Sequence, residues 1–274
     1  METRPATEAL SQREFEQISD LAYRTCGIDL GHGKQELVQA RLGKKIRQGH
    51  FESFRQYYDN VVADKTGREL ILLLDALTTN FTSFLREASH FEFLRKTIVP
   101  ALTGQIRIWS AACSTGEEPY TIAISLLEEL GMAASNRIHI LASDISSGAL
   151  ATAERAAYEA ERFRDFPGDW PKKYLLRGSG NWEGWFRVKP QVRRMVEFRR
   201  LNLMEPFHPP QPFQVIFCRN AMIYFNKTTQ ERLVNRFASC LEPGGYLLIG
   251  HAESLTGLTH PYEYVMPAVY RRPL

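Results

Sequence analysis

The 274-residue chain has few cysteines, little net charge and no long apolar run, and each absence excludes a class of protein. Its four cysteines lie far apart without metal-type spacing, so we expect reduced thiols in a cytoplasmic protein with no metal site. A net charge of +3 is too small to indicate a nucleic-acid partner. No apolar stretch reaches membrane-spanning length and the first residues are polar, so we expect neither membrane insertion nor a signal peptide.

The first third of the chain has helical spacing and no strand pattern. Ser11 and Glu14 form a capping-box pair before an apolar repeat that ends at Gly27. A second helix is predicted from about Lys34 to Gln48. Further apolar repeats predict two shorter helices, around residues 54–61 and 70–77. The second helix carries a basic face formed by Lys34, Arg41, Lys44 and Lys45. This region is therefore predicted to be a small helical domain.

From residue 106 onward, apolar strands alternate with helical segments. Strands are predicted over residues 106–112, 138–142, 196–201, 213–218 and 246–250. Helices are predicted from Glu117, from Ser146 to Ala160 and from Thr228 to Leu241. Such alternation indicates a parallel, doubly wound α/β sheet.

Three further segments depart from this alternation. Glu242-Pro-Gly-Gly predicts a sharp turn before the last parallel strand, and residues 262–271 predict a terminal hairpin. Between residues 166 and 196, several glycines and prolines surround short apolar runs. We interpret this segment as a small β-rich insertion.

The most informative segment is the strand–turn–helix of residues 106–125. Its helix opens with Glu117 and Glu118, so a pyrophosphate at the helix N-terminus would meet like charge, whereas a cationic ligand would be favoured. S-Adenosylmethionine carries a sulfonium and an ammonium and no phosphate. Alternatively, the two carboxylates only complement the helix dipole in an ordinary βα turn. The glycine pattern of nicotinamide dehydrogenases is absent.

Polar residues also follow the other predicted strands, at the edge where ligands of open α/β sheets bind. Asp144 is suited to grip a ribose diol; the alternative interpretation is that it caps the next helix, and the two roles are compatible. Asn202 could read an adenine edge or form an Asx-turn. Arg219 and Asn220 end a further strand.

The linker between the two regions, residues 78–86, carries three polar candidates, Asn80, Thr82 and Arg86. Phe81 and Phe84 are predicted core residues of this segment. Arg86 could bind a carboxylate through two parallel hydrogen bonds. The alternative is a helix that begins here, capped by Thr82 or Ser83, with Arg86 as a solvated charge.

These motifs together resemble the chemotaxis receptor glutamate methyltransferases, the CheR family. The resemblance rests on Thr-Asn-Phe-Thr-Ser-Phe-Leu-Arg (79–86), Ser-Ala-Ala-Cys-Ser-Thr-Gly-Glu-Glu-Pro-Tyr (110–120), Ala-Ser-Asp-Ile (142–145), Leu-Asn-Leu (201–203), Cys-Arg-Asn-Ala-Met-Ile-Tyr-Phe (218–225) and Leu-Glu-Pro-Gly-Gly-Tyr-Leu-Leu-Ile-Gly-His (241–251). It covers nearly the whole chain in order. Two departures occur: Ala252 stands where the family often has serine, and Leu85 replaces a frequent phenylalanine.

The resemblance implies a Rossmann-like methyltransferase domain over residues 86–274, with a β-subdomain at about 166–196, after a helical receptor-contacting domain over residues 1–85. It implies that the donor, S-adenosyl-L-methionine, is bound by Asn80, Thr82, Arg86, Glu117, Asp144, Asn202, Leu203, Arg219 and Asn220. It places the catalytic residues Arg86 and Tyr224 near the transferred methyl. The partners would be cytoplasmic domains of chemoreceptors, contacted through the basic face of the second helix by a monomeric enzyme. Whether the insertion docks a receptor C-terminal tail stays open.

Methyl transfer to a glutamate carboxylate requires no general base, because the nucleophile is already ionised near neutral pH. The sequence accordingly lacks an obvious His/Asp pair at its strand ends. Two alternatives remain at this point: another S-adenosylmethionine-dependent methyltransferase, acting on nucleic acid or a small molecule, and a non-catalytic binding module. Against a nucleic-acid amino-methyltransferase, Arg219-Asn220-Ala221-Met222 replaces the Asn/Asp-Pro-Pro-aromatic motif.

Overall fold

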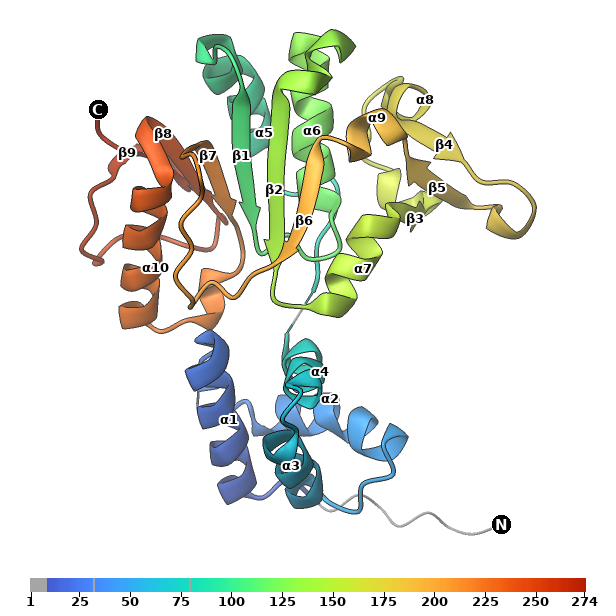
Figure 1. The fold of residues 1–274 in the computed structure, drawn as a ribbon, viewed down its shortest axis with the longest axis vertical. Helices are drawn as coiled ribbons and strands as arrows, with labels where there is room; N and C mark the ends of the chain where they lie inside the picture. Colours follow the sequence, from blue (N-terminus) through green and yellow to red (C-terminus); the bar gives the residue numbers. More distant parts are fainter. Residues whose placement is uncertain (1–8, 32, 79) are drawn as a thin grey trace. The chain divides into compact units, whose positions relative to one another are not determined.

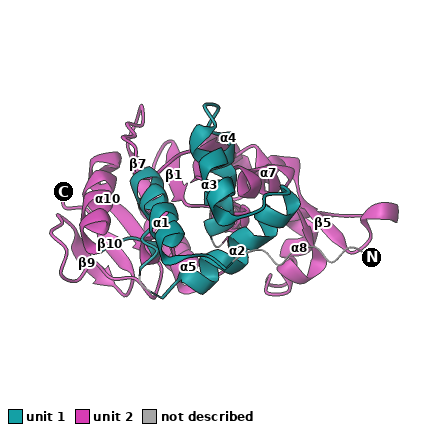
Figure 2. Cartoon of the chain, turned by 90° about the horizontal axis from the view of Figure 1, so that it is seen from below, with its two compact units in different colours: residues 1–79, 224–226 teal, residues 80–223, 227–274 magenta. Residues whose placement is uncertain are grey.

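The computed structural model describes residues 9–31, 33–78 and 80–274, and the chain divides into two compact units (Figure 2). Unit 1 comprises residues 1–79 with 224–226, and unit 2 comprises residues 80–223 with 227–274. Within the described ranges, no helix combines the length and hydrophobicity that a bilayer crossing requires.

The described residues of unit 1 form four helices, α1 (Gln12–Cys26), α2 (Gln35–Gln48), α3 (Phe54–Ala63) and α4 (Arg68–Leu77). The predicted capping box is present: the Ser11 hydroxyl accepts from the Glu14 N–H, and the Glu14 carboxylate accepts from the Ser11 N–H. Gly27 ends α1 in the left-handed region, with φ of 75°. Apolar side chains at helical spacing, such as Ile18, Leu42 and Leu74, are buried in its core.

Unit 2 is a seven-stranded sheet with the order β6-β2-β1-β7-β8-β10-β9 (Figure 1). The parallel strands are β1 (Ile106–Ala111), β2 (Ile138–Asp144), β6 (Val196–Arg200), β7 (Phe213–Cys218) and β8 (Leu241–Ile249). The terminal hairpin of β9 (Glu263–Met266) and β10 (Val269–Arg271) adds two antiparallel strands at one edge. The predicted fold class is confirmed.

Helices α6 (Glu117–Leu130) and α10 (Lys227–Cys240) lie on opposite faces of β1. Ser110 of β1 donates a hydrogen bond to Glu118 of α6, whereas Trp109 packs on Phe237 of α10 with ring centroids 5.3 Å apart. Since neighbouring strand residues face opposite sides, the two contacts define the two layers. The other helical segments outside the insertion are α5 (Ser89–Phe93), η1 (Leu94–Ile98), η2 (Val99–Ala101), η3 (Met132–Arg137) and α7 (Ser147–Arg155). The short segment η6 (Met222–Tyr224) begins in unit 2, and its last residue, Tyr224, belongs to unit 1.

The predicted β-rich insertion is a three-stranded antiparallel sheet with the order β3-β5-β4. Its strands are β3 (Ala157–Glu159), β4 (Leu175–Arg177) and β5 (Trp185–Val188), and its short helices are η4 (Ala160–Phe163), α8 (Trp170–Tyr174), η5 (Gly180–Trp182) and α9 (Pro190–Arg193). The helix predicted to reach Ala160 is wrong in its last turn. It ends at Arg155, because Ala156 adopts a left-handed conformation with φ of 54° and the next residues pair with β5.

The predicted Glu242-Pro-Gly-Gly turn is instead an irregularity inside β8. Phe213 pairs with Leu241 and Val215 with Tyr246, so extra residues bulge between the two pairs. Gly244 has φ of 76° within this bulge. The strand therefore starts five residues earlier than predicted.

Candidate functional site

The turn after β1 follows a partly left-handed path that brings its backbone to the end of β2. Ser114 and Gly116 have φ of 50° and 95°, and the Cys113 N–H donates to the Ser143 carbonyl at 2.9 Å. A Cβ atom at Gly116 would lie 2.7 Å from the Cβ of Ala153 in α7. Both the conformation and the space therefore require glycine there.

Asp144 ends β2 with a buried carboxylate directed at this turn. Its Oδ2 accepts from the Ser114 N–H and its Oδ1 from the Ser146 N–H, both at 2.8 Å. The cap of α7 is Ser146, whose hydroxyl accepts from the Ala149 N–H, so the alternative that Asp144 caps this helix is wrong. A carboxylate oxygen can accept more than one hydrogen bond, which leaves the arrangement compatible with a ribose diol.

Glu117 begins α6 and is completely buried. Its Oε2 accepts from the Thr115 hydroxyl at 2.6 Å, and its Oε1 forms an ion pair with Arg162 of η4. Burial raises the pKa of the Glu117 carboxyl, against the opposing effects of Thr115 and Arg162. Its position on the first turn also complements the helix dipole, as the alternative interpretation proposed.

Glu118 and Arg219 form a buried ion pair that the sequence did not predict. Arg219 Nη1 lies 3.0 Å from Glu118 Oε2, and Glu118 Oε1 accepts from the Ser110 hydroxyl at 2.7 Å. The second terminal nitrogen of the guanidinium, Nη2, lies 3.0 Å from Glu87 Oε2. The Arg219 side chain is 2% exposed, so its charge is committed to these two carboxylates.

Arg86 lies in a turn before α5 and is half-buried. Its Nη1 donates to the Phe81 carbonyl at 2.9 Å, and its guanidinium lies 5.6 Å from the centroid of the Phe81 ring. Phe84 is a core residue, as predicted, and stacks on Phe163 with centroids 4.5 Å apart. Phe81 is 69% exposed, so its predicted burial is wrong. The helix starts at Ser89, so neither alternative cap in the linker forms.

The linker reaches the same turn as Asp144. The Asn80 carbonyl accepts from the Ser114 hydroxyl at 2.9 Å, and the Thr82 side chain is buried. Thr79, the first residue of the quoted linker motif, lies outside the described residues. Ser114 thus joins Asn80 to Asp144, two candidate ligands that are 64 positions apart in the sequence.

The candidates after β6 and β7 are each held by hydrogen bonds within the protein. Asn202 Oδ1 accepts from the Met204 N–H at 3.0 Å, which is the Asx-turn of the alternative interpretation. The Leu203 carbonyl accepts from the Arg236 guanidinium. Asn220 follows β7 with φ of 57°, and its N–H donates to Glu253 Oε2 at 2.9 Å.

Tyr224, the second predicted catalytic residue, belongs to unit 1, where its carbonyl accepts from the Asp29 N–H at 2.8 Å. Within the same unit, Lys34 Nζ donates to the Asp29 carbonyl at 3.3 Å, and Arg41 donates to the Leu77 carbonyl at the end of α4. Of the predicted basic face, Lys44 is exposed.

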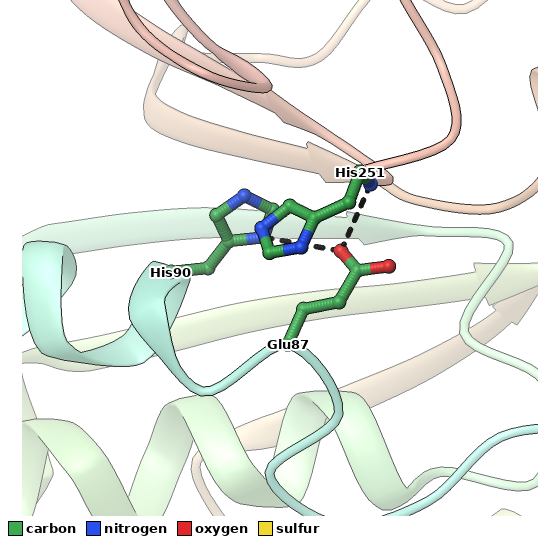
Figure 3. Close-up of side chains that lie close together, drawn as sticks. All are labelled: Glu87, His90 and His251. Carbon is green, nitrogen blue, oxygen red and sulfur yellow. Dashed lines mark hydrogen bonds and ion pairs between the residues drawn. The ribbon is translucent and has the colours of Figure 1, made fainter.

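Sequence reasoning missed a cluster of Glu87, His90 and His251, whose candidate ligand atoms lie within 4.8 Å of one another (Figure 3). Glu87 Oε2 accepts from the His251 N–H at 3.2 Å, and His90 Nδ1 lies 3.6 Å from the same oxygen. The guanidinium of Arg219 contacts this oxygen too, and its charge disfavours a divalent cation there. Two signals were available in the sequence: Glu87 directly follows Arg86, and His251 ends the quoted motif of residues 241–251.

The insertion carries a groove of about 490 Å³. Trp182 and Trp185 lie against each other at its wall, with centroids 5.8 Å apart, and Trp182 is 58% exposed. Three arginines join them: Arg155, Arg177 and Arg187. The groove therefore combines aromatic surface with positive charge.

Two family models match the chain. The CheR methyltransferase SAM binding domain matches residues 80–270, and the CheR methyltransferase all-alpha domain matches residues 13–78. The two matches meet between units 1 and 2.

Curated relatives match over nearly the full length. The chemotaxis protein methyltransferase of Salmonella typhimurium is 40% identical over 263 residues, which cover 96% of this chain and 91% of that protein. Chemotaxis protein methyltransferase 2 of Pseudomonas aeruginosa is 40% identical over 263 residues, covering 95% and 93%. The chemotaxis protein methyltransferase of Escherichia coli is 38% identical over 263 residues, covering 96% and 91%.

Proposed function

The chain belongs to the CheR methyltransferase family, and we propose that it methylates side-chain carboxylates of glutamates in chemoreceptors, with S-adenosyl-L-methionine as donor. The observation that carries the proposal is the buried Glu117 close to the Asp144 end of β2. Such an acidic site at the carboxyl ends of parallel strands suits a cationic donor and repels phosphate. The alternatives, a nucleic-acid or small-molecule methyltransferase and a non-catalytic module, are not favoured by these relatives.

The proposed donor ligands remain those predicted from the resemblance. They are Asn80, Thr82, Arg86, Glu117, Asp144, Asn202, Leu203, Arg219 and Asn220. Glu117 would pair with the ammonium group and Asp144 with the ribose hydroxyls. The Arg219 guanidinium is engaged with Glu118 and Glu87, so Arg219 would contribute through its backbone.

When bound, the donor supplies a methyl group on a positively charged sulfur, which a carboxylate oxygen displaces in line, leaving S-adenosyl-L-homocysteine. The C–S electron pair stays on sulfur while the new O–C bond forms. The protein's task is alignment of the two reactants, an effect that supplies roughly 7–11 kcal/mol in favourable cases. We assign this alignment to Arg86, with Tyr224 as its predicted support. A fully formed ion pair would quench the nucleophile, so Arg86 orients the carboxylate more than it neutralises it.

The receptor would dock on the basic face of α2. Lys34, Lys44 and Lys45 are its candidate contacts, whereas Arg41 also holds the end of α4. Opposite charge on an acidic helical bundle would steer this encounter and weaken with salt. We place the reaction in the cytoplasm, with the enzyme as a monomer.

The receptor C-terminal tail is a second proposed contact. Two tryptophans beside three arginines suit a short aromatic and acidic peptide. In the order β3-β5-β4, β4 is an edge strand, which offers backbone groups for an added peptide strand.

The experiment is incubation of the protein with methyl-labelled donor and chemoreceptor cytoplasmic fragments, with and without their last few residues. We expect label that alkali releases as methanol, since carboxyl methyl esters hydrolyse and N-methyl groups survive. Loss of the tail should reduce the rate if the groove binds it. Alkali-stable label, or turnover on none of the fragments, would contradict the proposed function.

A further inference from the structure

The segment around Arg86 is held in a conformation that its residues do not favour. Leu85 and Glu87, its two neighbours, both have φ of 56°. Left-handed backbone costs a residue other than glycine about 1–3 kcal/mol, and it persists only where surrounding contacts enforce it. Two such residues in three positions indicate that the Arg86 backbone is positioned from outside the segment.

Arg219 supplies one of these enforcing contacts. Its Nη2 donates to the Arg86 carbonyl and also lies 3.0 Å from Glu87 Oε2, while its Nη1 is anchored on Glu118. The guanidinium also lies 5.4 Å from the centroid of the Phe91 ring, within cation–π range. The Arg219 side chain is almost fully buried, so little water competes for this contact.

Glu87 supplies further contacts that hold the backbone around Arg86. Besides Arg219, its carboxylate accepts from Asn220 Nδ2 at 3.3 Å and from the His251 N–H at 3.2 Å. It thus ties this segment to Asn220, after the end of β7, and to His251, after the end of β8; Figure 3 shows the second of these contacts. Burial alone would raise the pKa of the Glu87 carboxyl, but the charge and hydrogen bond of Arg219, with the bonds from Asn220 and His251, hold it below its usual range.

We propose that Glu87 is a positioning residue for methyl transfer: with Arg219 it fixes the backbone of Arg86, and so the direction from which Arg86 meets the acceptor carboxylate. The inference rests on the proposed function, because it takes Arg86 as the group that orients the acceptor. A displacement of about 1 Å at such a group can cost roughly a hundredfold in rate. We therefore expect the loss of this contact to act on turnover more than on donor affinity.

The charge balance of the cluster makes the proposal testable. One guanidinium faces two carboxylates, so Glu87→Gln leaves Arg219 paired with Glu118 instead of uncompensated. The variant should therefore fold, since removing a carboxylate here strands no buried cation. Glu92→Gln, the same change at an exposed position of α5, is the matched control.

The experiment is a double-mutant cycle of wild type, Glu87→Gln, Arg86→Ala and the combined variant. It compares kcat on receptor fragments at saturating donor with the Kd for S-adenosyl-L-homocysteine from calorimetry. We expect Glu87→Gln to lower kcat by roughly ten- to a hundredfold while the Kd changes less than about threefold. In the Arg86→Ala background, adding Glu87→Gln should lower kcat by less than about a further threefold, because the effects of two residues that act through one another are not additive. Glu92→Gln should match wild type.

The inference would be overturned if the fold losses of kcat in the two single variants multiplied fully in the combined variant. It would also be overturned if Glu87→Gln kept the wild-type kcat, or if this variant lost only donor affinity. Each of these results leaves the proposed function standing. A wild-type protein that transfers no methyl to receptor carboxylates would remove the proposed function and this inference with it. If thermal unfolding shows that Glu87→Gln does not fold, Arg219→Lys replaces it in the cycle, because lysine keeps the charge but cannot span both carboxylates and the Arg86 carbonyl.

Discussion

At the scale of single residues, His90 sits in a strongly electrostatic environment. Its side chain is fully buried, and neither ring nitrogen has a hydrogen-bond partner among the described residues. Burial and the charge of Arg219 lower the pKa of His90 to about 3, against a weaker opposing effect of Glu87, and His251 adds a small further lowering. The ring is therefore neutral in the folded protein near neutral pH.

This neutral ring predicts an acid-dependent loss of stability. Between the unfolded pKa of about 6.5 and about 3, the unfolded chain binds a proton at His90 that the folded chain does not. The free energy of unfolding should therefore decrease as the pH is lowered through this window, by up to about 1.4 kcal/mol per pH unit from this group. His90→Phe should show a correspondingly shallower pH dependence in urea unfolding at pH 6.5 to 4.

The same substitution at exposed His208 controls for the added phenyl ring. An unchanged pH dependence in His90→Phe would mean that the folded protein protonates this ring as readily as the unfolded chain does.

At the scale of elements, local signals predicted the helices of unit 1 well. The Ser11 capping box and Gly27 are contacts within a few residues, and such contacts are visible in a sequence. The last turn predicted for α7 failed because β3 is stabilised by pairing with β5, 28 positions away, which overrides the helical preference of an alanine-rich segment. The predicted burial of Phe81 was wrong for a related reason: the hydrophobicity of a residue alone does not show whether the linker leaves its side chain in solvent.

In the candidate site, too, some features could be predicted from the sequence and others could not. Glu117 and Asp144 were predictable because each follows a strand, and parallel strands end at one edge of a sheet. The ion pairs of Arg219 with Glu87 and Glu118 were not, because they join residues more than 100 positions apart. No periodicity marks a contact of that kind, and only the fold brings its members together.

The basic face of α2 carries a prediction of its own. Lys44→Glu should raise the KM for receptor fragments several-fold at low salt and leave the Kd for the donor unchanged, because the change reverses a docking charge. Lys65→Glu, at an exposed position in the turn before α4, makes the same charge change outside α2 and should behave as wild type. If both variants changed the KM equally, the effect would come from net charge and not from docking on the basic face of α2.

At the scale of the whole molecule, each unit has its own core, and the family matches follow the same division. Unit 2 holds the acidic edge and the clustered ion pairs, and unit 1 holds the basic helix. This division separates recognition of the donor, in one unit, from the proposed recognition of an acidic protein in the other.

The proposed activity depends on one property, an acidic sheet edge that binds a sulfonium donor and disfavours phosphate. Calorimetric titration of the intact chain with S-adenosyl-L-methionine, S-adenosyl-L-homocysteine and NAD tests it directly. We predict saturable 1:1 binding of the first two, weakened roughly tenfold or more by Glu117→Gln, and no binding of NAD. Folded protein that takes up neither sulfur compound, or that binds NAD in their place, would contradict the account.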